Sequence, residues 1–205
     1  GGSSGIGKAA ALKIAEAGAK VVIAARGEEE LEVTRKEIID AGYICFAYKS
    51  DLADLDSCDS LIEQVNKDLG GIDILINNAG RSIRRSIELS FDRFHDFERT
   101  MQLNYFGSLR LIMQSLPRMI ERRRGHIINI SSIGVLASSP RFSAYVASKA
   151  ALDAFSSCAQ GELSGKGISF TTINMPLVKT PMIAPTKMYD SVPTLSPEEA
   201  ADLIV

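Results

Sequence analysis

Tryptophan is absent from this sequence, histidine occurs only twice, and lysine plus arginine nearly balance aspartate plus glutamate. Neither His95 nor His126 has a second ligand residue at metal-binding spacing, so no metal site is expected. The formal net charge of −2 gives no general attraction to nucleic acid or to an anionic membrane. These shortages argue against a metalloenzyme and against a nucleic-acid-binding protein.

Cysteine is also scarce, and Cys45, Cys58 and Cys158 lie far apart in apolar or helical contexts. An odd number without a spacing pattern predicts reduced structural thiols in a cytoplasmic protein. No apolar stretch reaches about 18 residues and no signal-peptide pattern is present, so neither a transmembrane segment nor secretion is expected. With 205 residues, 45% of them hydrophobic, the chain can bury one sizeable core, and residues 1–205 are expected to form a single domain.

Tyr145 and Lys149 stand four residues apart in a helical stretch. Residues with this spacing share one face of a helix, about one turn apart. A free tyrosine has a pKa of about 10, and a fixed cation beside it favours the phenolate, which suits proton transfer at neutral pH. An exposed helical pair is the simpler alternative. Ser132 favours the chemical interpretation, because it follows the apolar run 127–130, where a strand would deliver a hydroxyl to the edge of a sheet.

Glycines at the start of the chain fit the pattern G-x-x-x-G-x-G, with Gly1, Gly5 and Gly7 in the glycine positions. Glycine lets backbone N–H groups approach phosphate oxygens, and a helix N-terminus favours negative charge. A helical stretch over residues 8–17 and a β-branched run over residues 21–25 follow, an order that a glycine-rich linker would not show. The pattern therefore predicts a dinucleotide-binding turn.

Helices and strands alternate along the middle of the chain. We expect helices over residues 28–41, 54–69 and 91–121, and strands over residues 43–48, 72–76, 126–130 and 168–173. This alternation predicts a parallel sheet covered on both faces, with ligands at the carboxyl ends of the strands. Asp51 and Leu52 follow one such end, although Asp51 could equally cap the next helix.

These motifs, in this order and with residues 77–80 between them, resemble the short-chain dehydrogenase/reductase family over essentially the whole chain. The resemblance implies a Rossmann-like, doubly wound α/β fold in three layers, and a homodimer or homotetramer. The family has a central strand before the glycine turn. Because the sequence begins inside that turn and stops early in a helix near residue 197, we expect a fragment that lacks its first and last strands.

The resemblance also implies the roles of four catalytic residues. Tyr145 would donate the proton, Ser132 would hydrogen-bond the carbonyl oxygen, and Lys149 would hold the nicotinamide ribose and favour the phenolate. Asn104 would mark a helix kink whose carbonyl holds a relay water. The resemblance implies no metal-binding residue.

The cofactor positions that the resemblance implies are Gly1, Ser3, Ser4, Gly5, Ile6, Gly7, Arg26, Asp51, Leu52, Asn78, Ala79, Gly80, Tyr145, Lys149, Pro176, Val178 and Thr180. Arg26 stands where an NAD enzyme usually has an acidic residue, so NADP(H) is expected to be preferred and NAD(H) to be possible. A solvated arginine at a helix start is the alternative. Leu177 replaces a family glycine, which predicts either crowding or a different φ at that position.

Residues 81–88, 93–107, 122–132 and 176–199 resemble more specifically the carboxy-terminal reductase domain of bacterial fatty acyl-CoA reductases. This implies reduction of an apolar carbonyl, a long-chain aldehyde, to an alcohol, in a chain that belongs to a larger reductase. A general ketone or hydroxysteroid reductase and a non-catalytic dinucleotide-binding module are the alternatives. Residues 182–192 are expected to form a mobile lid over the substrate, or else a packed surface helix.

Overall fold

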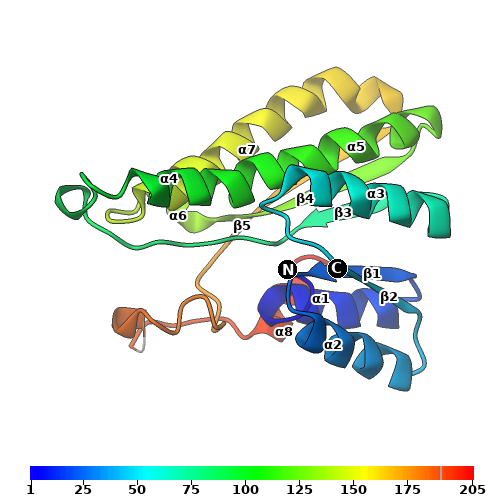
Figure 1. Ribbon diagram of the computed structural model, residues 1–205, viewed down its shortest axis with the longest axis horizontal. Helices are drawn as coiled ribbons and strands as arrows, with labels where there is room; N and C mark the ends of the chain where they lie inside the picture. The colour runs from blue at the N-terminus through cyan, green and yellow to red at the C-terminus, as the bar shows by residue number, and fades with distance from the viewer. Residues whose placement is uncertain (190) are drawn as a thin grey trace. The chain divides into compact units, whose positions relative to one another are not determined.

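The computed structural model describes residues 1–189 and 191–205, and of Met188 the backbone alone. The chain forms two compact units, which Figure 1 shows with their helices and strands labelled. The first unit contains Gly1–Asp51 and Met175–Val205, and the second contains Leu52–Asn174.

The first unit is built from short elements at both ends of the chain. They are α1 (Gly5–Glu16), β1 (Val21–Ala25), α2 (Glu28–Asp40), β2 (Cys45–Lys49), a 3₁₀ turn (Lys187–Tyr189) and α8 (Pro197–Asp202). Strands β1 and β2 are parallel, with Val21 beside Cys45. Alternate residues of β1 are buried, as a strand covered on one face requires.

Small side chains bring α1 and α8 together in this unit. Ala9 and Ala10 of α1 are buried against Ala201 of α8. The predicted start of α8 is confirmed, because Ser196 and Glu199 form a reciprocal capping box and Pro197 occupies the first turn. The two helices therefore join the two ends of the chain into one packed body.

The second unit carries the longer helices. Its elements are α3 (Leu55–Leu69), β3 (Ile74–Asn77), a 3₁₀ turn (Ile87–Leu89), α4 (Phe94–Met101), a π-helix η2 (Gln102–Gly107), α5 (Ser108–Glu121), β4 (Gly125–Ser132), α6 (Ile133–Ala137), α7 (Ser143–Leu163), a 3₁₀ turn (Ser164–Lys166) and β5 (Ile168–Met175), whose last residue is assigned to the first unit.

Strands β3, β4 and β5 lie in that order, and β3 is parallel to β4. Helices α5 and α7 pack against β4. The core between them consists of fully apolar side chains from α5, α7 and the strands, namely Ile112, Leu116, Met119, Ile127, Leu152 and Ile168. Burial of this kind stabilises the unit by roughly 25 cal/mol for each Å² of apolar surface removed from water.

The observed elements agree with the expected alternation, with three differences. The helix expected over residues 91–121 begins at Phe94 and is interrupted by η2, which contains Asn104. The loop expected after Ser132 contains the short helix α6. The described strands form two separate sheets, β1-β2 and β3-β4-β5. The absence of a first and a last strand from a family fold stays a prediction.

The three cysteines carry free thiols. Cys45 and Cys58 are buried, and burial raises the pKa of the Cys45 thiol to about 11. A thiol held neutral in this way is unreactive, in agreement with the structural role predicted for Cys45, whereas Cys158 is exposed. Within the described residues, no helix combines the length and the apolar character needed to cross a membrane.

Candidate active site

Lys149 lies on the buried face of α7, one turn after Tyr145. Its side chain is almost completely enclosed, with 4% of the residue's surface exposed, and its Nζ donates to the Ile130 carbonyl at 2.6 Å. Burial lowers the pKa of Lys149 to about 8, and the carboxylate of Asp153 acts in the opposite direction. Tyr145 is half-buried. The helix thus presents a fixed ammonium and a phenol on one face.

Ser132 is the last residue of β4 and the N-cap of α6. Its backbone is extended, and its Oγ accepts a hydrogen bond from the Gly134 N–H at 3.1 Å. A hydroxyl that accepts one N–H still has its own proton to donate. The predicted placement of this hydroxyl at the end of a strand is confirmed.

Asn104 is fully buried in the π-helix η2. Its Oδ1 accepts from the Arg81 N–H at 2.8 Å, and its Nδ2 donates both to the Arg81 carbonyl and to Ser148 Oγ at 2.9 Å. The side-chain amide is therefore occupied in holding the chain, and only the backbone of Asn104 is left for chemistry. Single π-helical turns inside α-helices are frequent at functional sites.

Gly80 adjoins both of these residues. A Cβ placed on Gly80 would lie 3.5 Å from Asn104 Oδ1 and 3.6 Å from Lys149 Nζ. Asn78 and Ala79, which precede it after β3, are half-buried. The second unit thus brings Gly80, Asn104 and Lys149 together from three separate stretches of sequence.

The glycine turn lies in the first unit and opens α1. Gly5 has a left-handed φ of +52°, and a Cβ there would come within 3.1 Å of Thr180 Cγ2. The Gly2 N–H donates to the Ala24 carbonyl at 3.1 Å, which ties the turn to β1. The first turn of α1 has no acidic side chain, and Ser4 makes no side-chain cap. These features fit an anionic dinucleotide, for which helix N-termini and glycine turns are suited.

Other cofactor candidates of the first unit sit around this turn. Ser3 offers its carbonyl to Thr34 Oγ1 at 3.3 Å, whereas Ile6 and Gly7 begin α1. Gly1 and Arg26 are exposed, Arg26 directly after β1. Within the first unit, the predicted cofactor residues between Gly1 and Gly7 therefore lie at the start of α1, with Thr180 beside Gly5.

Residues 176–178 lead into Thr180 through an extended stretch. Val178 is buried and bridges to Leu195, and the Leu195 N–H donates to the Leu177 carbonyl at 2.9 Å. Pro176 is half-buried. Leu177 has no positive φ, so its backbone lies outside the left-handed region that favours glycine.

Asp51 is the last residue of the first unit and is exposed, and Leu52 begins the second unit. The interpretation of Asp51 as a helix cap is wrong. Helix α3 begins four residues later, at Leu55, and its N-cap is Asp54, whose carboxylate accepts from the Asp56 N–H at 3.0 Å. The role of Asp51 in cofactor binding stays a prediction. Leu52 contributes its carbonyl to Cys58 Sγ at 3.7 Å.

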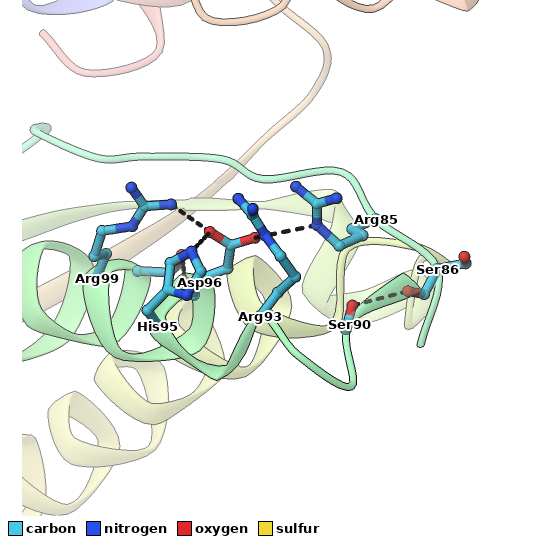
Figure 2. Close-up of polar contacts among 8 residues, drawn as sticks. Arg85, Ser86, Ser90, Arg93, His95, Asp96 and Arg99 are labelled. Carbon is cyan, nitrogen blue, oxygen red and sulfur yellow. Dashed lines mark hydrogen bonds and ion pairs between the residues drawn. The ribbon is translucent and has the colours of Figure 1, made fainter. Parts of the chain in front are cut away.

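A cluster around Asp96 was missed by the sequence analysis. Figure 2 shows three arginines and His95 surrounding this carboxylate. Asp96 is 2% exposed, with Arg85 Nε at 3.1 Å, Arg93 Nε at 3.5 Å and a hydrogen bond from Arg99. Burial alone would raise the pKa of Asp96, but the hydrogen bonds and charges of the arginines lower it below its usual range.

The cluster holds the segment 81–85 next to the candidate residues. At one end of the segment, the backbone of Arg81 is hydrogen-bonded to Asn104, and at the other the Arg85 N–H donates to the Arg141 carbonyl at 2.7 Å, just before α7. The i,i+3 spacing of Arg93, Asp96 and Arg99 was a signal in the sequence, but Arg85 lies outside that pattern.

Comparison with known proteins identifies the family to which this chain belongs. Residues 1–189 match the short chain dehydrogenase family. The whole chain is 60% identical to a fatty acyl-CoA reductase of Acinetobacter baylyi and covers 70% of that protein. It is 50% identical to a fatty acyl-CoA reductase of Mycobacterium tuberculosis, again covering 70%. An uncharacterized oxidoreductase of Mycobacterium bovis is 55% identical, and the chain spans 61% of its length.

Solved structures show the same fold. A metagenomic short-chain oxidoreductase in complex with NADP matches all of this chain and 85% of its own, with a TM-score of 0.85 and 29% identity. An actinorhodin polyketide ketoreductase variant with NADPH matches all of this chain and 86% of its own, with a TM-score of 0.91 and 27% identity. The predicted Rossmann-like, three-layer α/β fold is confirmed, and the chain belongs to the short-chain dehydrogenase/reductase family of NAD(P)-dependent oxidoreductases.

Proposed function

We propose that this protein reduces a long-chain aldehyde to an alcohol with NADPH, and that Tyr145 is the general acid. The burial of Lys149, with its ammonium fixed on the Ile130 carbonyl one turn from Tyr145, is the observation that carries the proposal. Burying a cation is costly, so a lysine enclosed beside a phenol is expected where its charge is needed for chemistry.

The residues divide the work of a carbonyl reduction. The bound NADPH supplies the hydride. Tyr145 donates a proton to the oxygen that becomes the alcohol, and Ser132 donates a hydrogen bond to the same oxygen as its negative charge develops. Lys149 favours the phenolate that Tyr145 leaves behind and holds the ribose hydroxyls. Lys149 then passes a proton to the Tyr145 phenolate by way of the ribose hydroxyl, and a relay water on the Asn104 carbonyl returns a proton to Lys149.

NADPH preference rests on Arg26, which is exposed at the end of β1. A guanidinium can pair with a 2′-phosphate, and such charge-assisted contacts contribute roughly 1.5–3 kcal/mol. In Arg26→Ala, kcat/KM with NADPH should therefore fall about tenfold or more while kcat/KM with NADH changes little. Lys20→Ala, which removes an exposed cation just before the same strand, is the control. An unchanged NADPH/NADH ratio would refute the assignment.

Substrate class is inferred from the relatives named fatty acyl-CoA reductases and from residues 182–192. This lid segment lies partly outside the described residues, which omit Asp190 and the side chain of Met188. Met182 and Val192 are 46% and 43% exposed, and the described residues of the segment contain a 3₁₀ turn, Lys187–Tyr189, and no longer helix. Exposed, flexible apolar side chains suit an apolar chain of variable length.

The deciding experiment measures NADPH oxidation by the full-length protein with aldehydes of increasing chain length and with a panel of ketones. For aldehydes, kcat/KM should rise by up to about 0.8 kcal/mol per methylene and then level off. The rise should weaken in Met182→Ser. A flat profile would remove the long-chain assignment and favour a general ketone or hydroxysteroid reductase. No turnover of any carbonyl would favour a dinucleotide-binding module.

The cellular setting follows from the same comparisons. Since the chain spans 61% to 70% of its relatives, we infer that it functions as part of a larger reductase chain. We infer a homodimer or homotetramer from the family and a cytoplasmic location from the three separate free thiols. Light scattering of the full-length protein tests the assembly.

A further inference from the structure

Two hydrogen bonds fasten the end of β4 to α7 immediately before Ser132. Lys149 Nζ donates to the Ile130 carbonyl at 2.6 Å, and Ser131 Oγ donates to Asp153 Oδ2 at 2.8 Å. Ser132 is the next residue along the strand. Its position relative to α7 therefore depends on two neighbouring attachments, one at Lys149 and one at Asp153.

Asp153 also continues the stripe of Tyr145 and Lys149 along α7. The three residues are spaced by four, so they follow one another on one face of the helix, about one turn apart. Asp153 Oδ1 is buried and has no hydrogen-bond partner among the described residues. A buried carboxylate oxygen without a partner costs stability. Packing alone gives no reason for a carboxylate here, because an apolar side chain would avoid that cost.

The surroundings of Lys149 leave Asp153 as its counter-charge. From β4 it meets the neutral Ile130 carbonyl, and Gly80 and the neutral Asn104 side chain lie beside it. On α7 itself, the Tyr145 phenol and the Asp153 carboxylate precede and follow it. Helix α4 also packs on α7. Its His95 and Arg99 are gathered at Asp96, and its Glu98 is exposed.

Among the described charged groups, the Asp153 carboxylate is the one that raises the pKa of Lys149 against the effect of burial. The relation is reciprocal. Burial raises the pKa of Asp153, whereas the Ser131 hydrogen bond and the Lys149 charge lower it. Each group thus favours the charged form of the other.

We propose that Asp153 is a positioning residue of the reaction, which keeps Lys149 in its cationic form and, through Ser131, fixes the end of β4 that carries Ser132. This inference rests on the proposed roles of Lys149 and Ser132. It adds a charge that the sequence motif of Tyr145 and Lys149 does not contain. Both functions of Asp153 are exerted at a distance from the substrate, so they can be separated by substitution.

Two variants separate charge from attachment. Asp153→Asn removes the charge but keeps a side-chain oxygen that accepts from Ser131, whereas Ser131→Ala removes the hydrogen bond and keeps the charge. Ser157→Ala is the matched control, because this exposed hydroxyl on α7 donates to the Asp153 backbone carbonyl rather than to its carboxylate. Circular dichroism and thermal unfolding of all three establish that the variants are folded.

The first readout is the protonation of Lys149 itself, measured in the full-length protein as the pH dependence of the Lys149 Cε chemical shift in an NMR spectrum assigned with Lys149→Met. Asp153→Asn should lower the midpoint of this titration by about one pH unit, as loss of a neighbouring opposite charge typically does. Ser131→Ala and Ser157→Ala should leave this midpoint unchanged. The measurement needs no turnover, so it stands even if the substrate or the reaction has been assigned wrongly.

The second readout is the pH profile of kcat/KM for carbonyl reduction. Reduction needs a protonated Lys149, so its alkaline limb should move to lower pH in Asp153→Asn by the same amount. Ser131→Ala should instead lower kcat about tenfold at every pH without moving the limb, since a small displacement of Ser132 weakens its hydrogen bond to the developing oxyanion. Neither the titration midpoint of Lys149 nor the alkaline limb should differ between Asp153→Asn and its parent if the proposal is wrong.

Discussion

The two units of this protein use their polar groups in opposite ways. In the first unit, ion pairs such as Lys8 with Glu37 and Lys36 with Asp40 lie at the surface. The second unit encloses polar groups: its buried polar residues are Asn77, Asp96, Thr100, Asn104, Ser108, Ser115, Asn129, Ser131, Ser148, Lys149 and Ser156. In the first unit, the polar residues that the structure describes as buried are Thr34 and Ser50.

This difference follows from what each unit is proposed to bind. A phosphate-binding turn uses backbone N–H groups and the absence of side chains, as at Gly5, where a left-handed φ adjoins Thr180. A site for proton transfer needs side chains with defined protonation, held away from water. We therefore expect substitutions in the first unit to change cofactor affinity and those in the second unit to change chemistry.

Tyr145→Phe should give the largest effect on activity. It removes the proposed acid and little packing, so kcat for reduction should fall by about 10²–10⁴-fold, the usual contribution of general acid catalysis. Cofactor affinity, measured by fluorescence titration with NADPH, should stay within about twofold, because RT ln 2 is under half a kcal/mol. A variant that kept a tenth or more of the parent kcat would show that another group supplies the proton.

Lys149→Met should separate function from stability. Reduction should be lost and cofactor affinity lowered, yet unfolding by urea at pH 7 should require up to about 2 kcal/mol more free energy, because an apolar side chain avoids the burial of a charge. In this variant the Ile130 carbonyl loses its donor and the Asp153 carboxylate loses its neighbouring positive charge, and both losses limit the gain.

The pH dependence gives the control for Lys149→Met. Burial lowers the pKa of Lys149 to about 8 from 10.5, so between these values the unfolded chain binds more protons than the folded one. The parent's unfolding free energy should therefore rise with pH across this window, while the variant lacks this rise. The advantage of the variant should be largest below pH 8 and shrink as the pH rises. A variant less stable than the parent at pH 7 would contradict a costly burial.

The alternating helices and strands could be predicted because each is encoded locally. Strand β4 coincides with an apolar run, and Asp54 and Gly70 bound α3 with an N-cap and a left-handed C-cap. Tyr145, Lys149 and Ser132 were also visible, through spacing and through family resemblance. Their geometry depends on tertiary contacts, and no local pattern shows that the Lys149 ammonium is held by the Ile130 carbonyl.

Groups that act through distant partners escaped the sequence analysis. Asp96 is one acidic residue among several in its segment, and only folding brings Arg85 to it (Figure 2). Asp153 has the same character, because its partner Ser131 lies on a strand that precedes the helix. Asp51 shows the opposite error. Its position before a predicted helix allowed it to be a cap, but α3 begins later and is capped by Asp54.

Gly5→Ala tests the backbone character of the first unit. The left-handed φ of +52° and the 3.1 Å approach of a Cβ to Thr180 should cost about 1–2 kcal/mol. Part of this cost should appear as a higher Kd for NADPH, whereas kcat at saturating cofactor should change less than twofold. Gly18→Ala, at a positive φ with open space around it, is a control for backbone strain without crowding. Equal cofactor affinity in both variants would mean that Thr180 does not constrain the turn.

Lys36→Ala should have the smallest effect. The Lys36 and Asp40 side chains are 69% and 61% exposed, and the lysine precedes the acid, the less favourable order on a helix, so the pair should contribute less than about 0.5 kcal/mol.

Ser156→Ala is the counterpart in the second unit, where the buried Ser156 Oγ accepts from Asn129 Nδ2 at 2.8 Å. Its loss leaves a buried donor without an acceptor and should cost about 1–3 kcal/mol. Urea unfolding of the two variants at low and high salt compares them directly: only the Lys36 effect should vanish with salt, and equal effects would end the distinction between surface and buried polar groups.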